Sequence, residues 1–176
     1  MVWLARHGET AYNAVRRFQG QSGVGLNERG REQARALADL AAGHDFASLW
    51  CSPLARARET GEIVAARIGL DPGYDARLME TDAGDWTDRM FDDVAAEDPE
   101  RFALFVAGDP GFGFPGGESF AQQQDRVCAA IEEIRASDEL PALVVCHRNS
   151  MRLALERFHG DAPSLDELPN GALVAL

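Results

Sequence analysis

Apolar residues recur along this chain with two alternating periods, one typical of strands and one typical of helices. Short apolar runs predict five strands, at 1–5, 47–51, 74–78, 141–146 and 172–176. Apolar residues three or four positions apart predict helices at 27–42, 53–68, 119–135 and 149–158. Strands interleaved with helices favour a mostly parallel central sheet covered on both faces, which is a three-layer α/β/α sandwich.

Local signals indicate where two of these helices begin or end. Ser52 is expected to cap the helix that follows the second strand, and Gly69 to end it. Ser119 and Gln122 form a capping box at the start of a later helix. The segment 80–117 is acidic in its middle and rich in glycine and proline at its end, and we expect it to be the least regular part of the chain.

Length and composition predict a single soluble domain over residues 1–176, because a chain of this size can bury its own core. No apolar run approaches the ~20 residues that cross a bilayer, and no secretory leader is recognisable at the start. Cys51, Cys128 and Cys146 have no paired spacing, so we expect buried thiols rather than a disulfide. These features favour a cytoplasmic protein.

The charge balance narrows the class of partner. All 17 basic residues are arginine, and 29 acidic residues bring the net charge to −12. This argues against nucleic acid or an anionic membrane as partner, and the absence of lysine excludes a Schiff-base mechanism. The four histidines have no zinc-ligand spacing, so we expect no metal site.

Arginines and histidines follow three of the predicted strands. Arg6 and His7 end the first strand, Arg56 lies in the helix after the second, and His147 follows the apolar run 141–146. Because the carboxyl ends of parallel strands share one edge of a sheet, we expect these four side chains to meet there. Taken alone, Arg56 would be a solvated helix residue and His147 a core histidine; together they predict an anion site.

These residue types suit phosphoryl transfer. A nucleophilic imidazole must be neutral, and neighbouring guanidiniums disfavour a second positive charge on His7. The same guanidiniums can hold phosphoryl oxygens with paired hydrogen bonds. Glu80, a surface carboxylate if taken alone, would protonate a leaving alkoxide and later take a proton from water.

Four segments, at 4–10, 51–60, 78–86 and 144–152, together resemble the histidine phosphatase superfamily, in its phosphoglycerate mutase-like branch. The resemblance extends from residue 4 to residue 176. It implies that His7 becomes phosphorylated, that Arg6, Arg56 and His147 complete the phosphate pocket, and that Glu80 moves the proton. It also implies that Asn13, Gln19 and Gly20 border the pocket and contact the substrate. Arg148 and Asn149, which follow the second histidine, are further candidate substrate-binding residues.

The sequence departs from the family's motifs mainly at positions that select the substrate. Arg148 stands where the family usually has glycine after the second histidine, and Trp86 is followed by Thr87 and Asp88 instead of the usual Glu and Gly. Two interpretations of Arg148 stay open: it binds a second anionic group of the substrate, or it turns away to pair with an acid such as Glu118.

The predicted function is a phosphomonoester hydrolase acting without cofactor on a small phosphorylated metabolite through phosphohistidine. Alternatives are a phosphoglycerate mutase-type isomerase, a protein phosphohistidine phosphatase and a silent phosphate-binding module. The chain is expected to lack the added segments that shield phosphohistidine in mutases, and 81–117 has only two basic residues, Arg89 and Arg101. Exposed phosphohistidine favours hydrolysis. The sequence indicates no oligomeric state.

Overall fold

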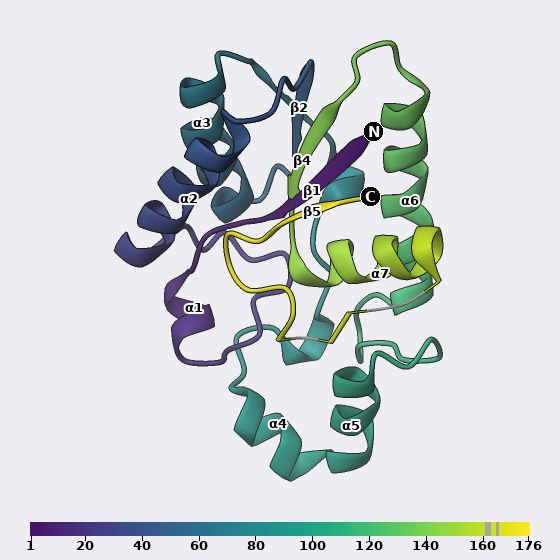
Figure 1. The fold of residues 1–176 in the computed structure, drawn as a ribbon. Helices are drawn as coiled ribbons and strands as arrows, with labels where there is room; N and C mark the ends of the chain where they lie inside the picture. Colours follow the sequence, from purple (N-terminus) through teal and green to yellow (C-terminus); the bar gives the residue numbers. More distant parts are fainter. Residues whose placement is uncertain (161–162, 165) are drawn as a thin grey trace.

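The sheet at the centre of the molecule has five strands in the order β3-β2-β4-β1-β5 (Figure 1). The computed structural model describes residues 1–160, 163–164 and 166–176. The strands are β1 (Val2–Arg6), β2 (Ser48–Cys51), β3 (Pro72–Tyr74), β4 (Ala142–Cys146) and β5 (Leu173–Ala175). The first four run parallel, and β5 pairs antiparallel with β1. The predicted mostly parallel sheet is confirmed.

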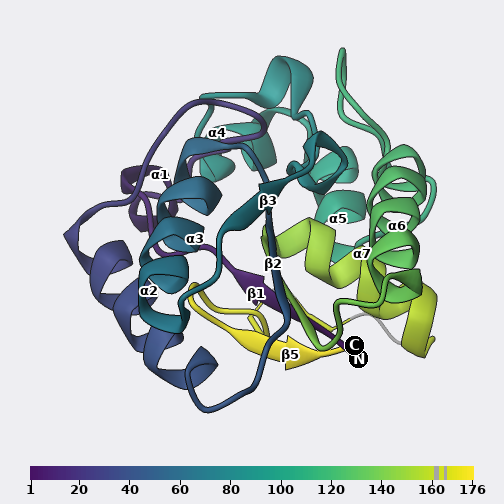
Figure 2. The ribbon, with the colours of Figure 1, turned by 90° about the horizontal axis from the view of Figure 1, so that it is seen from above.

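Two pairs of long helices cover the sheet, one pair on each face (Figure 2). They are α2 (Glu28–Ala41) with α3 (Ala55–Ile68), and α6 (Phe120–Ala136) with α7 (Arg148–His159). Alternate residues of β4 pack into opposite cores, Val144 with the α6–α7 side and Val145 with the α2–α3 side. Burial on both faces explains why β4 is an unbroken apolar run.

The predicted helix ends are confirmed at two positions and wrong at a third. The capping box of Ser119 and Gln122 is formed, and Gly69 ends α3 in the left-handed conformation with φ of +74°. Ser52 does not cap α3, which begins two residues later than predicted, after Leu54. The hydroxyl of Ser52 is buried against His147 instead, so a contact across the sheet takes the place of a helix cap.

The third strand also lies earlier than predicted. It spans Pro72–Tyr74, and Ala76–Leu78 forms a short 3-10 helix. The carboxylate of Asp75 accepts a hydrogen bond from the backbone N–H of Arg77, which turns the chain out of the sheet.

The segment 80–117 is more regular than its composition predicts. It contains a 3-10 turn (Gly84–Trp86) and two helices, α4 (Phe91–Glu97) and α5 (Pro99–Ala107). Asp98 caps α5, and Pro99 takes its first position, where a missing N–H costs nothing. Both helices lie beyond the edge of the sheet at which β1 and β4 end (Figure 1).

An aromatic cluster holds α4 and α5 against the rest of the molecule. Its centre is Phe105, which packs against Phe18, Trp86, Phe112 and Phe114 at ring-centroid distances of 5.2–6.1 Å. Aromatic side chains bury large areas, so they stabilise two short helices whose own propensity is weak.

All three cysteines are buried and free, as expected. Within the described part of the chain, no helix combines the length and the apolar character that crossing a membrane requires.

Candidate active site

His7 lies directly beyond the end of β1 and is almost fully buried, with 2% of its surface exposed. Its Nδ1 lies 2.7 Å from the carbonyl oxygen of Gly8, and its Nε2 lies 3.2 Å from Nε of Arg56. Because a guanidinium only donates hydrogen bonds, Nε2 is the unprotonated nitrogen and Nδ1 carries the proton. The tautomer of His7 is therefore fixed by its two neighbours.

The charge state of His7 follows from the same surroundings. Burial, followed by the positive charges of Arg56 and Arg6, holds the pKa of His7 well below its ordinary value. A neutral imidazole with a lone pair on Nε2 is the form that can act as a nucleophile.

Two arginines flank His7, and backbone carbonyls fix both. Arg6 Nη1 donates to the carbonyl of Leu168 at 2.6 Å, and Arg56 Nη2 donates to the carbonyl of Gly20 at 2.7 Å. Burial lowers the pKa of Arg6 to about 9 and that of Arg56 to about 10, so both remain cations near neutral pH. Two nearly buried guanidiniums that keep their charge form a strong anion site.

His147 lies behind His7, with 5.1 Å between the two ring centroids. Its Nε2 lies 2.7 Å from Oγ of Ser52, while its Nδ1 is buried without a hydrogen-bond partner among the described residues. Burial, followed by the charge of Arg56, holds the pKa of His147 well below its ordinary value. One ring nitrogen of this neutral histidine is thus left for a ligand.

Glu80 is held at the pocket by donors from three directions. Its Oε1 accepts from Nε2 of Gln123 and from the backbone N–H of Thr81, both at 3.0 Å. Its Oε2 accepts weakly from the N–H of Asn149 at 3.4 Å. The carboxylate lines the same cavity as His7, so a group that can exchange protons and a neutral imidazole share one space.

The structure brings the residues predicted from the sequence together. Nine of the ten line one cavity, and they are Arg6, His7, Asn13, Gln19, Gly20, Arg56, Glu80, Arg148 and Asn149. The tenth, His147, lies just behind the cavity, against His7. Aromatic residues of the cluster around Phe105 form another wall of the cavity.

The turn that follows β1 organises the entrance of the cavity. The Thr10 hydroxyl donates to Oε1 of Gln19 at 2.8 Å, and the Thr10 N–H donates to Oδ1 of Asn13 at 3.1 Å. Gly20 has φ of +51°, a conformation that suits glycine and turns its carbonyl to Arg56. Asn13, Gln19 and Gly20 thus have fixed places at the pocket.

One interpretation of Arg148 is wrong. Glu118 does not pair with Arg148, because both of its carboxylate oxygens accept hydrogen bonds from Arg126 at 2.6 and 2.7 Å. Arg148 is the first residue of α7 and lines the cavity beside Glu80 and Asn149.

Four residues that the sequence did not assign to the site support it. Gln123, Thr81 and Ser150 form a buried hydrogen-bonded group behind Glu80, and Ser52 holds His147. Gln123 carries a signal in the sequence, because it lies on the apolar face of α6 between Phe120 and Val127. A polar side chain at such a position needs a buried partner.

The arrangement can bind a phosphate dianion and accept its phosphoryl group. An unprotonated nitrogen faces a cavity with two fixed cations, and a carboxylate stands beside it. Charge on the oxygens of a transferring phosphoryl group is stabilised by such guanidiniums.

Comparison with known sequences agrees with this chemistry. The sequence profile of the histidine phosphatase superfamily (branch 1) matches residues 2–175. The probable phosphoglycerate mutase GpmB of Salmonella choleraesuis is 38% identical over 130 residues, which are 74% of this chain. The match covers 60% of the length of that relative.

Solved structures with the same fold include two that are named for a phosphatase activity. A mycobacterial glucosyl-3-phosphoglycerate phosphatase complexed with VO3 superposes with a TM-score of 0.87 at 28% identity, over 98% of this chain and 90% of that one. A putative alpha-ribazole-5'-P phosphatase from Escherichia coli superposes with a TM-score of 0.81 at 29% identity, over 98% of this chain and 87% of that one.

Bacillus stearothermophilus YhfR gives a TM-score of 0.86 at 31% identity, over 98% of this chain and 88% of that one. The profile match over nearly the whole chain and these shared folds confirm the resemblance seen in the sequence. The chain belongs to branch 1 of the histidine phosphatase superfamily.

Proposed function

We propose that this protein is a phosphomonoester hydrolase that acts on a small phosphorylated metabolite through a phosphohistidine at His7. The observation that carries the proposal is the hydrogen bond from Arg56 to Nε2 of His7. It places the lone pair of the imidazole on the nitrogen next to the guanidinium that would hold the phosphate.

In the first step, Nε2 of His7 attacks phosphorus while the bond from phosphorus to the ester oxygen breaks. The hydrogen bond that Arg56 donates from its Nε–H changes partner, from the imidazole to a phosphoryl oxygen. Arg6 binds the same phosphoryl group. Nδ1 of His147, which lacks a partner among the described residues, supplies a further contact to the phosphoryl oxygens. The leaving alkoxide takes a proton from Glu80.

In the second step, water attacks the phosphorus of phosphohistidine and the N–P bond breaks. The carboxylate of Glu80 takes the proton of the attacking water, so inorganic phosphate and the starting form of the enzyme result. Such a general acid and base contributes ~10²–10⁴-fold to the rate.

The surroundings of the pocket favour hydrolysis over isomerisation. The cavity around His7 shares Arg6, Asn13 and Arg148 with an open cleft of about 1070 Å³. Water that reaches the cleft also reaches the phosphoryl group, whereas a mutase must keep water from its phosphohistidine. The two related phosphatases named above support this assignment, and the relatives named phosphoglycerate mutase support isomerisation as the second candidate.

A colorimetric assay separates these candidates. The wild-type protein, assayed with p-nitrophenyl phosphate in the presence of a chelator, should release phosphate, and His7→Ala should lose about 10³-fold or more of this activity. His159→Ala is the matched control, because this histidine is exposed at the end of α7.

Equal activity in the wild type and in His7→Ala would contradict the proposal. With 3-phosphoglycerate as substrate, formation of 2-phosphoglycerate faster than release of phosphate would identify a mutase instead. Binding of phosphate without turnover of any ester would identify a silent binding module.

A further inference from the structure

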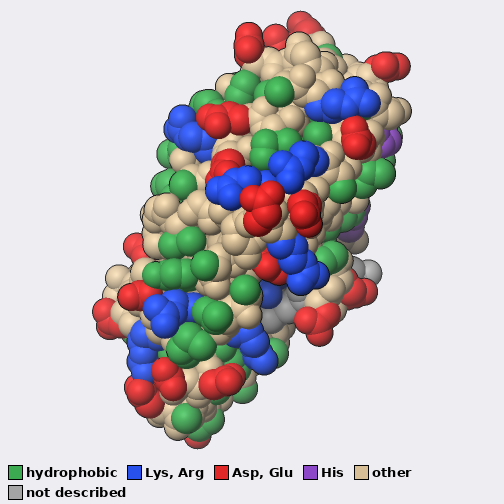
Figure 3. Space-filling model, turned by 90° about the vertical axis from the view of Figure 1, so that its left-hand side faces the viewer, with side chains coloured by type: hydrophobic (Ala, Val, Ile, Leu, Met, Phe, Trp, Pro, Cys, Tyr) green, Lys and Arg blue, Asp and Glu red, His purple; other side chains and the backbone are tan. Residues whose placement is uncertain are grey.

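The arginines of this acidic protein divide into two groups. Nine form ion pairs with carboxylates, many of them on the face around α1 and α2, where arginine and acidic side chains are interspersed (Figure 3). Eight of the 17 form no ion pair with any described carboxylate. Five of these eight lie at one place, the cavity of His7 and the cleft beside it, and they are Arg6, Arg16, Arg56, Arg148 and Arg152. A net charge of −12 makes this concentration of uncompensated guanidiniums notable.

The proposed phosphoryl transfer uses only two of these five arginines. Arg6 and Arg56 flank His7, whereas Arg16 and Arg152 line the cleft and not the cavity of His7. Arg148 lines both, so it connects the two spaces. Among the described residues that line the cleft, six arginines face three carboxylates, so the cleft is positive although the protein is acidic.

Two of the three remaining guanidiniums, those of Arg152 and Arg16, lie close enough to act on the charge of the third, Arg148. The charges of Arg152 and Arg16 add to the effect of burial in lowering the pKa of Arg148, which the carboxylates of Glu80 and Asp166 oppose. Arg16 is exposed, and its guanidinium lies 5.7 Å from the ring centre of Phe91. Cations held together in this way indicate a site for an anion.

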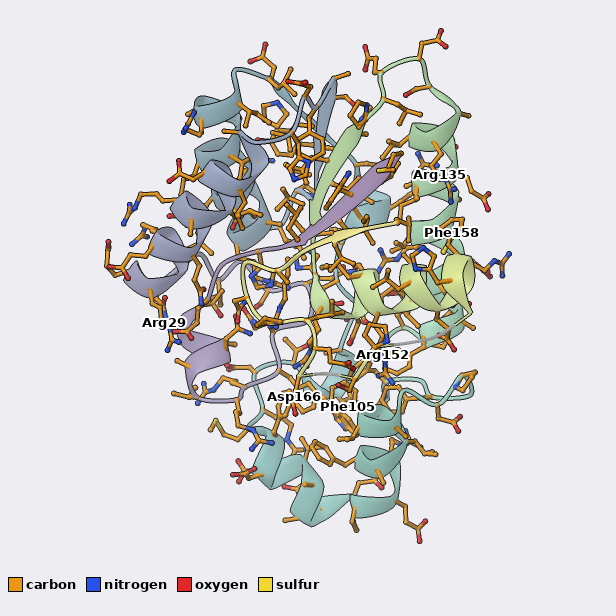
Figure 4. The ribbon with its side chains drawn as sticks, viewed as in Figure 1. Arg29, Phe105, Arg135, Arg152, Phe158 and Asp166 are labelled. Atoms are coloured by element: carbon orange, nitrogen blue, oxygen red, sulfur yellow. The ribbon has the colours of Figure 1, made fainter. Side chains whose placement is uncertain are left out.

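Arg152 shows that the site is built into the fold. It is 7% exposed, its Nη2 donates to the carbonyl of Ala107 at 2.7 Å, and its Nη1 is buried without a partner among the described residues. Gly108 makes room for it, because a Cβ there would lie 1.9 Å from Nη2. A buried charged donor without a partner destabilises the folded state, so an acceptor at this position would relieve that cost. Figure 4 shows Arg152 beside Phe105 and Asp166, below α7.

We infer that Arg16, Arg148 and Arg152 form a second anion site, which binds a carboxylate or phosphate of the substrate whose phosphoryl group lies at His7. The inference rests on the proposed function, because it names the class of substrate for that site. The preferred substrates are phosphomonoesters that carry a second negative group, and Arg148 is the residue that spans the two sites.

Three substrates test this inference. Glycerol 3-phosphate has no charged group besides its phosphate, 3-phosphoglycerate replaces the terminal hydroxymethyl group by a carboxylate, and propane-1,3-diol bisphosphate carries a second phosphate. The wild type should show a kcat/KM at least about tenfold higher for one or both of the anionic compounds than for glycerol 3-phosphate, and the better of the two identifies the group. The difference should appear in KM, because the site binds a part of the substrate that does not react.

Substitutions of the cleft arginines test whether the cleft causes the preference for anionic esters. Arg148→Gln and Arg16→Gln should reduce the ratio of kcat/KM between the preferred anionic ester and glycerol 3-phosphate by about tenfold or more, since each removes a charge-assisted contact. Arg135→Gln is the matched control, because Arg135 stacks on Phe158 on the far side of α7 and forms no ion pair with the described residues (Figure 4). It should leave the ratio as in the wild type.

The outcomes separate failure of this inference from failure of the proposed function. Equal kcat/KM for all three substrates in the wild type, or an unchanged ratio in both cleft variants, would overturn the second anion site while hydrolysis stands. If no ester is hydrolysed, the proposed function fails. In that case calorimetry measures the Kd of 3-phosphoglycerate and of glycerol 3-phosphate for the wild type and for Arg148→Gln. The inference stands if the wild type prefers 3-phosphoglycerate and the variant loses that preference, and it fails if the two proteins show the same ratio of Kd values.

Discussion

The side-chain amide of Gln123 lies 3.0 Å from Oε1 of Glu80 and is completely buried. Its Nε2 also lies 3.1 Å from Oγ of Ser150, and its Oε1 accepts a hydrogen bond from the hydroxyl of Thr81. Residues of α6 and α7 therefore hold the carboxylate of Glu80 in one place beside His7. A carboxyl group fixed in this way loses little conformational freedom when a ligand binds.

Replacing Glu80 should have an effect that depends on the leaving group. Glu80→Gln should slow hydrolysis of alkyl phosphates by ~10²–10⁴-fold, because an alkoxide needs a proton to leave. Nitrophenolate leaves without one, so p-nitrophenyl phosphate should lose much less in the phosphorylation step. The kcat/KM values of the two esters, which report the steps up to phosphorylation of His7, measure this, and an equal loss of kcat/KM for the two would place the proton donor elsewhere.

Replacing Gln123 should produce the same pattern more weakly. Gln123→Leu removes a hydrogen bond to a charged group, so we expect kcat/KM for alkyl phosphates to fall about tenfold. The kcat/KM for p-nitrophenyl phosphate should fall less, which distinguishes loss of positioning from loss of folded protein.

Gln124→Leu is the control for this variant, since Gln124 follows on the same helix and donates to the carbonyl of Leu153. It should show no dependence on the leaving group. A Gln123→Leu variant that loses activity equally with both esters would have a structural defect only.

The sequence predicted the part of the fold that depends on local pattern. β4 is an apolar run because both of its faces are buried, and the capping box of Ser119 is a local motif. The helices α4 and α5 escaped prediction because they are short, and their apolar residues are buried by residues outside the two helices, such as Phe18 and Phe114. Ser52 was misassigned because its buried partner, His147, comes from a different strand end.

The site was predictable to the extent that it follows strand ends. Arg6, His7 and His147 lie where parallel strands finish, so the topology brings them together. Gln123 and Arg152 come from the interiors of α6 and α7, and only the packing of these helices brings them to the site. The sequence alone could not separate Arg152 from any other helical arginine.

Stability should decrease in mild acid because two histidines are buried in the neutral form. The pKa values of His7 and His147 lie well below ~6.5, the value in the unfolded chain. Below pH ~6.5 the unfolded chain therefore binds protons that the folded protein does not. The free energy of unfolding should fall as the pH drops below ~6.5, by at most about 1.4 kcal/mol per pH unit for each histidine.

Urea unfolding at pH 7.5 and at pH 5 measures this loss. Replacing both buried histidines by glutamine should reduce the difference between the two pH values, whereas replacing the exposed His159 should leave it unchanged. Protonation of the carboxylates contributes equally to the pH difference in all of these proteins, because the variants change no carboxylate. If the free energy of unfolding changes by the same amount between the two pH values in the double variant and in the wild type, protonation of the buried histidines does not cause the loss of stability.

During turnover we expect Nε2 of His7 to carry the phosphoryl group, because Arg56 and the carbonyl of Gly8 fix its lone pair there. Rapid quenching during turnover of a phosphate-labelled ester, without acid, would trap this intermediate. We expect a phosphoprotein that is stable in base and labile in acid, with the label on His7, and no label in His7→Ala. Equal labelling of wild type and His7→Ala, or turnover of the ester with no trapped phosphoprotein, would contradict it.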